Sequence, residues 1–130
     1  CLSSLNNLEK NINIIRKQAK LYTSSLNEKF ISTFPNCSLN VEQNVYWHFP
    51  ININKNYDLF RDYLFKNGID CVRYGLPLNN ELEEFKIFKE PLIKSNRIKN
   101  KSLFLPIHPN YNLRFIKKII ETVNNFQYEV

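Results

Sequence analysis

Residues 5–26, LNNLEKNINIIRKQAKLYTSSL, do more than any other stretch to decide the fold of this chain. Apolar side chains recur along it at alternating spacings of three and four residues, at Leu5, Leu8, Ile12, Ile15, Ala19, Tyr22 and Leu26. This spacing puts them on one stripe of an α-helix, and charged residues such as Glu9 and Lys20 fall on the opposite face. We therefore predict one long amphipathic helix. Its stripe either packs on its own domain or faces a partner in part, and we expect only partial cover within this chain.

Beyond residue 44 the sequence alternates between strand-like and helix-like segments. The predicted strands are 45–51, 69–74 and 102–107. Pro50 lacks a backbone N–H and so places the first strand at a sheet edge or at the strand's own end. The predicted helices are one capped by Asp58 and ended by Gly68, a short turn at 81–85, and a last helix from near Asn112 with Leu113, Ile116, Ile120 and Val123 on one stripe. This order predicts an α+β fold, in which a long N-terminal helix precedes a small, mostly antiparallel three-stranded sheet with helices on one face.

Length and composition indicate a single domain. The chain has 130 residues, of which 43% are hydrophobic, and this is enough for one core. Its 2 glycines exclude a glycine-rich phosphate loop, and no apolar run reaches the roughly 18 residues of a membrane helix. Because the chain lacks Met, we expect it to be a piece cut from a longer protein. We divide this domain, 1–130, into a linking helix at 1–30 and an α+β part at 44–130.

The residue types give little support to a metal site or a catalytic site. Cys1, Cys37 and Cys71 are spaced too widely for a disulfide framework, and no CxxC accompanies the two histidines, His48 and His108. No pair of carboxylates is placed for hydrolysis of a glycosidic bond. We therefore predict no metal, no catalytic residue and a reducing, cytoplasmic compartment.

A net charge of +6 and many aromatic residues raise a second possibility, a non-enzymatic module that binds RNA or a protein partner. Residues 94–101 form a basic segment, and aromatic residues lie on the predicted strands. However, the aromatic motif of RNA-recognition domains, with its glycines, has no counterpart here. We expect weak, salt-labile nucleic-acid binding at most, no specific nucleic-acid partner and no membrane partner.

Several segments, taken in order, carry a resemblance to a known family. They are Leu8, Arg16, Ala19, Tyr22 and Leu26; Tyr46–Ile51; Arg61–Asp62 with Gly68–Ile69; Arg73–Tyr74 with Pro77–Asn79; and Leu105–Pro109. In this order they resemble the C-terminal small domain of the DegT/DnrJ/EryC1/StrS sugar aminotransferases. The resemblance implies the small domain of the aspartate-aminotransferase fold type. It also implies a longer protein that uses pyridoxal phosphate to move an amino group onto a keto-sugar nucleotide in polysaccharide biosynthesis.

The resemblance also implies what this chain lacks. The family's cofactor lysine and phosphate-binding residues lie in an N-terminal domain, and no lysine here matches that motif. The resemblance therefore implies no cofactor-binding residue in this chain and no activity for the chain alone. The implied partners are the N-terminal cofactor domain, a nucleotide-sugar substrate and a second subunit in a homodimer of the longer protein.

By matching position, the resemblance places His48, Arg73 and Tyr74 on the substrate cleft, with Trp47 behind them. The planar guanidinium of Arg73 suits a phosphate or a carboxylate, because it can form paired hydrogen bonds with either group. Arg73 and Asn79 stand where many family members have histidines that face the nucleotide-sugar pocket. The identity of the sugar and of the amino donor does not follow from these residues.

Overall fold

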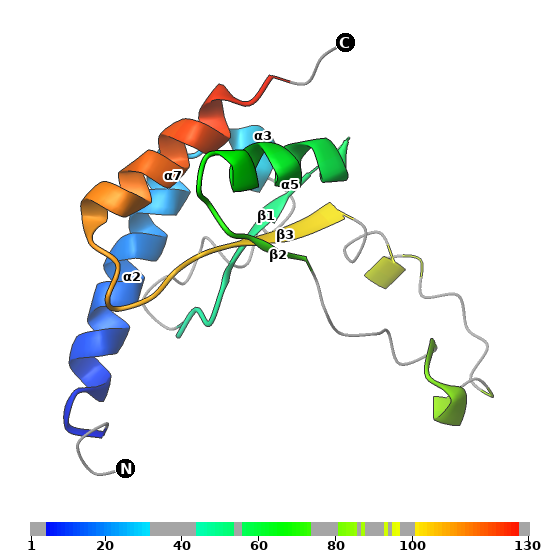
Figure 1. Ribbon diagram of the computed structural model, residues 1–130. Helices are drawn as coiled ribbons and strands as arrows, with labels where there is room; N and C mark the ends of the chain where they lie inside the picture. The colour runs from blue at the N-terminus through cyan, green and yellow to red at the C-terminus, as the bar shows by residue number, and fades with distance from the viewer. Residues whose placement is uncertain are drawn as a thin grey trace.

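The computed structural model describes residues 5–31, 44–53, 56–73, 81–85, 87, 93, 95–96 and 101–127. Its elements are α2 (Leu8–Ser25), α3 (Glu28–Ile31), β1 (Phe49–Asn52), α5 (Tyr57–Lys66), β2 (Val72–Arg73), the 3-10 helix η2 (Glu83–Phe85), β3 (Ser102–Leu105) and α7 (Leu113–Asn125). This mixture of helices and strands confirms the predicted α+β class (Figure 1). Cys1, Cys37, Tyr74 and Asn79, with most of the basic segment 94–101, lie outside the described residues.

The strands form one antiparallel sheet in the order β1-β3-β2. Phe49 pairs with Leu105, and Ile51 pairs with Leu103. These side chains are buried, whereas Phe104, between the two leucines of β3, is only half-buried. Because alternate residues of a strand point to opposite faces, the sheet has one core face and one face turned away from the core.

Helices and sheet share one hydrophobic core. Tyr22 of α2 stacks on Phe49 of β1 with ring centroids 4.8 Å apart. Phe60 of α5 meets Phe126, which follows α7, edge-on at 4.7 Å. Ile116 of α7 is fully buried in the same cluster. Burying one such side chain contributes about 1.5–3 kcal/mol, so these contacts bind the helices to the core face of the sheet.

Helix α2 runs alongside α7 and packs on the domain from about Ile15 onward. Gln18 contacts the turn before α7, and Asn124 at the end of α7 contacts Ser25. In Figure 1 the first turns of α2 extend past the rest of the domain. Leu5 is 63% exposed and Leu8 is 48% exposed. The predicted stripe is therefore covered only in part, as expected.

All three predicted strands were too long, and the third, predicted at 102–107, ends at Leu105. Residues 45–48 are not part of β1, because Tyr46 has a left-handed φ of 38° and turns the chain just before Phe49. Within the described residues, the predicted strand 69–74 reduces to Val72–Arg73. The position of Pro50 was read correctly, since β1 lies at an edge of the sheet.

The helix ends also differ from prediction in part. Helix α5 begins at Tyr57, so Asp58 lies in its first turn and not at its cap. Gly68 follows α5 with φ 74°, which confirms its predicted role in ending the helix. Leu113 was expected on the buried stripe of α7 but is 49% exposed, because it opens the helix at the surface.

Candidate functional site

Aromatic rings form a column on the face of the sheet turned away from the core. The rings of Trp47 and His48 are nearly parallel, with centroids 5.5 Å apart and an interplanar angle of 14°. The ring of His48 in turn lies 5.7 Å from that of Phe104. Trp47 is 87% exposed, and His48 is half-buried. The column therefore ends in a flat ring with a free face, which is suited to stacking against a ligand.

A local backbone turn produces this exposure. Tyr46 has a left-handed φ of 38°, which costs energy for a bulky residue. Its side chain remains buried and stacks on Phe49 with centroids 6.0 Å apart, while the next residue, Trp47, points to solvent. Arg16 of α2 fixes the start of the turn, because its Nε donates to the carbonyl of Asn44 at 3.1 Å. The strained residue is thus held from two sides.

The structure brings together only part of the predicted site. Trp47 and His48 are in ring contact, as described above. Arg73 pairs with Leu103 in β2, on the far side of β3 from β1. Strands are spaced at about 4.8 Å, so the backbone of Arg73 lies about 10 Å from β1 across the sheet. Tyr74 lies outside the described residues.

Sequence reasoning missed Gln18, which fastens α2 to the turn before α7. Gln18 is fully buried, and its Nε2 donates to the carbonyls of His108 at 2.9 Å and of Tyr111 at 2.7 Å. Its Oε1 accepts from the N–H of His108 at 3.2 Å. One turn later, the hydroxyl of Tyr22 donates to the carbonyl of Pro106 at 2.9 Å. A polar residue beside Ala19 on the buried stripe was the available signal.

The buried Tyr22 and the half-buried Cys71 have shifted pKa values. Burial raises the pKa of the Tyr22 hydroxyl, so it remains a donor throughout the ordinary pH range. Burial, with a smaller effect of Asp70, raises the pKa of the Cys71 thiol to about 11. A thiol with a raised pKa is a poor nucleophile at neutral pH, which makes Cys71 unsuited to covalent catalysis.

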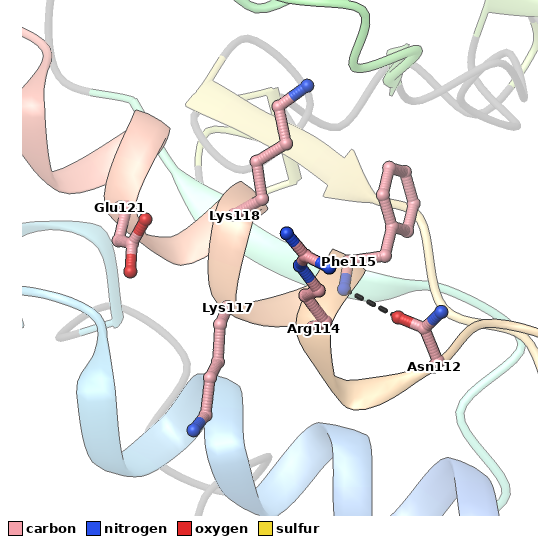
Figure 2. Close-up of a pocket in the computed structure, with 6 residues that line it drawn as sticks. All are labelled: Asn112, Arg114, Phe115, Lys117, Lys118 and Glu121. Atoms are coloured by element: carbon pink, nitrogen blue, oxygen red, sulfur yellow. Dashed lines mark hydrogen bonds between the residues drawn. The ribbon is translucent and has the colours of Figure 1, made fainter.

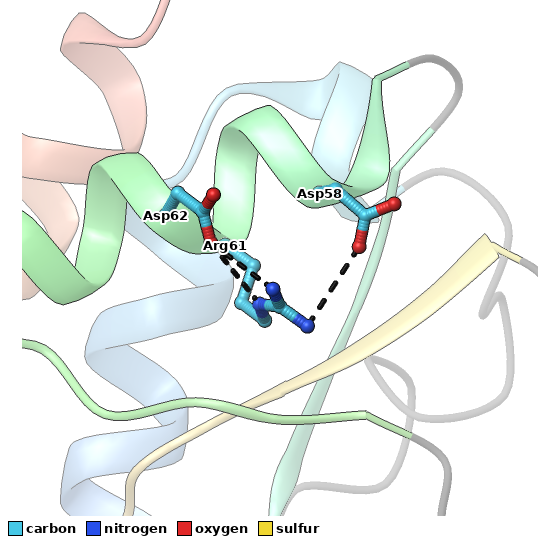
Figure 3. Close-up of polar contacts among 3 residues, drawn as sticks. All are labelled: Asp58, Arg61 and Asp62. Carbon is cyan, nitrogen blue, oxygen red and sulfur yellow. Dashed lines mark hydrogen bonds and ion pairs between the residues drawn. The ribbon is translucent and has the colours of Figure 1, made fainter.

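The Arg61–Asp62 pair is a surface cluster on α5 (Figure 3). Arg61 donates to Asp62 through Nε at 3.3 Å and through Nη2 at 3.1 Å, and Nη1 lies 3.7 Å from Asp58. The hydrogen bond with Asp62 is the main reason that the pKa of Arg61 is raised. All three side chains are exposed, so the cluster contributes little to stability, and it reaches no other element through these contacts.

Metal and membrane features are not found in the described part of the chain. Among the described residues, no group of three or more His, Cys, Asp or Glu side chains could hold a metal ion. No helix among those same residues has the length and hydropathy to cross a membrane.

The fold of this chain is similar to part of several solved aminotransferase structures. One of the DegT DnrJ EryC1 StrS type from Brucella abortus has a TM-score of 0.78 and 21% identity, over 94% of this chain and 32% of its own. PseC of Helicobacter pylori, an aminotransferase involved in the biosynthesis of pseudoaminic acid, has a TM-score of 0.68 and 20% identity. The match covers 94% of this chain and 34% of PseC. The sugar aminotransferase CalS13 of Micromonospora echinospora has a TM-score of 0.74 and 15% identity. The match covers 95% of this chain and 32% of CalS13.

This chain therefore has the fold of about a third of these aminotransferases, which confirms the resemblance at the level of the fold. It spans only that share of their length. No protein-family model matches the chain, and no curated protein matches it in sequence.

Proposed function

We propose that this chain is the small domain of a pyridoxal-phosphate-dependent sugar aminotransferase of the aspartate-aminotransferase fold type. The observation that carries the proposal is the structural match, which covers 94% of this chain but only 32% of the Brucella abortus aminotransferase. Two of the similar proteins are described as acting in sugar or pseudoaminic acid chemistry. The longer protein would transfer an amino group onto a keto-sugar nucleotide, and this domain would close one side of the cleft.

The described lysines do not fit covalent attachment of pyridoxal phosphate. Such a lysine must be desolvated in an apolar pocket or lie beside another cationic group. Seven of the eight described lysines are exposed, among them Lys10, Lys17 and Lys20 on α2. Lys117 and Lys118 do lie beside Arg114, but they are exposed to water on the outer face of α7, and Lys101 is half-buried. We therefore assign the cofactor, its lysine and its phosphate-binding residues to another domain of the longer protein. We assign no step of the reaction to the residues of this chain.

The aromatic column is the proposed substrate contact of this domain. Trp47 offers a free ring face to the substrate, and His48 supports that ring from beneath. By matching position, Arg73 and Tyr74 remain proposed substrate contacts, and Arg73 suits a phosphate or a carboxylate. These residues would position the substrate against the cofactor domain without taking part in proton transfer.

The projecting half of α2 is the proposed link to the cofactor domain. Leu5 and Leu8 lie on this half and are exposed. An apolar stripe in water favours burial against another surface. The same stripe, or the cleft face, would also meet the second subunit of a homodimer of the longer protein.

The substrate contact can be tested by titrating the chain with a uridine-diphosphate sugar and following Trp47 fluorescence. Trp47 is the single tryptophan, so quenching reports directly on this ring. We expect saturable quenching that His48→Ala weakens and that Phe65→Ala, an exposed aromatic change on α5, leaves intact. Absence of quenching at millimolar ligand, or equal losses in both variants, would refute this contact.

The cofactor assignment has its own test. The chain should give the absorbance of free pyridoxal phosphate and only scattered lysine adducts after borohydride reduction. One stoichiometric adduct on a single lysine would contradict the proposal. Binding of RNA at physiological salt with sequence preference would instead favour a nucleic-acid module.

A further inference from the structure

Helix α7 presents a basic outer face that the sequence patterns did not single out. Arg114, Lys117 and Lys118 are exposed within two turns of its start. They border an open hollow of about 560 Å³ (Figure 2). The hollow is lined by Asn112, Arg114, Phe115, Lys117, Lys118 and Glu121. The chain as a whole is basic, and three of its cations line this one hollow, with Lys117 and Lys118 extending from α7 in opposite directions (Figure 2).

The charges of this face are only partly balanced within the described residues. Glu121 lies four residues after Lys117 and three after Lys118, whereas Arg114 has no carboxylate at such a spacing on α7. Arg114 and Lys118 are four residues apart on one helix, where like charges repel. The first turn of α7 has no acidic residue, although the positive end of the helix dipole favours one there. No described residue forms an ion pair with the cations of the hollow. An anion in the hollow would relieve both kinds of repulsion.

Backbone groups at the start of α7 add hydrogen-bond donors. The side chain of Asn112 accepts from the N–H of Phe115 at 2.8 Å and so caps one of the first N–H groups (Figure 2). The N–H groups of Leu113 and Arg114 have no helical carbonyl four residues back. Donors of this kind favour phosphate oxygens.

We propose that this hollow binds a small ligand with a diphosphate group. Arg114 supplies a planar fork for two phosphate oxygens, Lys118 supplies a compact charge, and the half-buried ring of Phe115 forms an apolar wall. Arg114 to Lys118 spans about 6 Å along the axis, which suits two adjacent phosphates and not an extended strand. Glu121 limits the basic face beyond them. The site shares no residue with the aromatic column and is independent of the proposed function.

Calorimetric titration of the chain with inorganic pyrophosphate at low salt tests the proposal. We expect saturable binding that Arg114→Gln and Lys118→Gln each weaken about five-fold. Glu121→Gln removes the one carboxylate of the hollow and should tighten binding by about two- to five-fold. Inorganic phosphate should bind more weakly than pyrophosphate, because it offers fewer charges.

The matched control is Lys66→Gln, an exposed lysine on α5 with the same change of net charge. Circular dichroism of each variant checks that the fold is kept. Absence of pyrophosphate binding, equal weakening by Lys66→Gln, or no tightening by Glu121→Gln would overturn the proposal. It would also be overturned if a uridine oligonucleotide bound more tightly than pyrophosphate and all the variants weakened it equally, since that result indicates attraction by net charge alone.

Discussion

Replacing Gln18 should weaken the attachment of α2 to the rest of the domain more than any other single polar change on that helix. The amide of Gln18 forms three hydrogen bonds, at 2.7, 2.9 and 3.2 Å, from a fully buried position. Gln18→Leu keeps most of the volume and removes all three. At about 1 kcal/mol for each bond, the loss is about 3 kcal/mol. Water can reach part of the exposed turn, which reduces the expected loss to about 2–3 kcal/mol.

This loss can be converted into a shift of the melting temperature. The unfolding entropy is about 2.1 cal/mol/K per residue, or about 0.27 kcal/mol/K for 130 residues. A loss of 2–3 kcal/mol then lowers Tm by about 7–11 °C. Thermal unfolding followed by circular dichroism and urea unfolding at 25 °C measure the two quantities. The matched control is Lys17→Leu, an exposed neighbour on the same helix, which should change stability by less than about 0.5 kcal/mol.

A second substitution separates lost hydrogen bonds from altered packing. Gln18→Glu keeps the shape but turns a carboxylate oxygen toward the carbonyls of His108 and Tyr111. Burial raises the folded-state pKa of such a carboxyl above its unfolded value, so stability is greatest below the unfolded pKa and falls as pH rises through the folded pKa. The variant should therefore be more stable at pH 4 than at pH 7, relative to wild type. The reasoning is refuted if Gln18→Leu matches Lys17→Leu and Gln18→Glu shows no such pH dependence.

Three further predictions concern a thiol, a glycine and the free half of α2. With the other cysteines changed to serine, the rate of alkylation of Cys71 should increase with pH with an apparent pKa of about 11. Because the folded thiol titrates above its ordinary value of 9.0, the free energy of unfolding should fall between pH 9 and 11. A midpoint near 9 in the rate profile would contradict this. Gly68→Ala should cost about 1–2 kcal/mol in urea unfolding purely through its φ of 74°, since a Cβ there meets nothing within 4 Å, and Gly68→Asn should cost less; equal stability of all three proteins would count against it. Changing Leu5 and Leu8 together to Gln should reduce concentration-dependent association in sedimentation without lowering Tm, and unchanged association would show that this surface is not involved.

The parts of the fold that follow from local patterns were predictable. The three-four spacing of α2 identified the helix and its apolar stripe, because a helical stripe depends only on residue order. Gly68 marked a helix end, since its left-handed φ suits glycine above other residues. Pro50 indicated a sheet edge or a strand end, because proline has no backbone N–H to donate to a neighbouring strand, and β1 lies at the edge.

The parts that depend on distant contacts were not predictable from those patterns. Tyr46 adopts a left-handed φ that its own side chain disfavours, and it is held there by Phe49 and by the Arg16 contact to Asn44. The burial of Gln18 depends on carbonyls about 90 residues further along the chain. Of the candidate site, the sequence resemblance indicated Trp47 and His48, but their mutual stacking became visible only in three dimensions.

The order in which the chain is made has a consequence for how α2 folds. Several groups that hold its second half belong to the last quarter of the sequence. One of them, Asn124, donates to the carbonyl of Ser25 at 2.8 Å and accepts from the N–H of Asn27 at 2.9 Å. A ribosome adding about 5–20 residues per second needs about 5–20 s to make the intervening stretch of 97–99 residues. During that interval α2 has its earlier partners, such as Phe49, but lacks the contacts from the last part of the chain that complete its burial. Most of the stability of a helix in a protein comes from such packing. The domain therefore completes its fold only when α7 has left the ribosome, and until then part of the apolar stripe of α2 is available to chaperones.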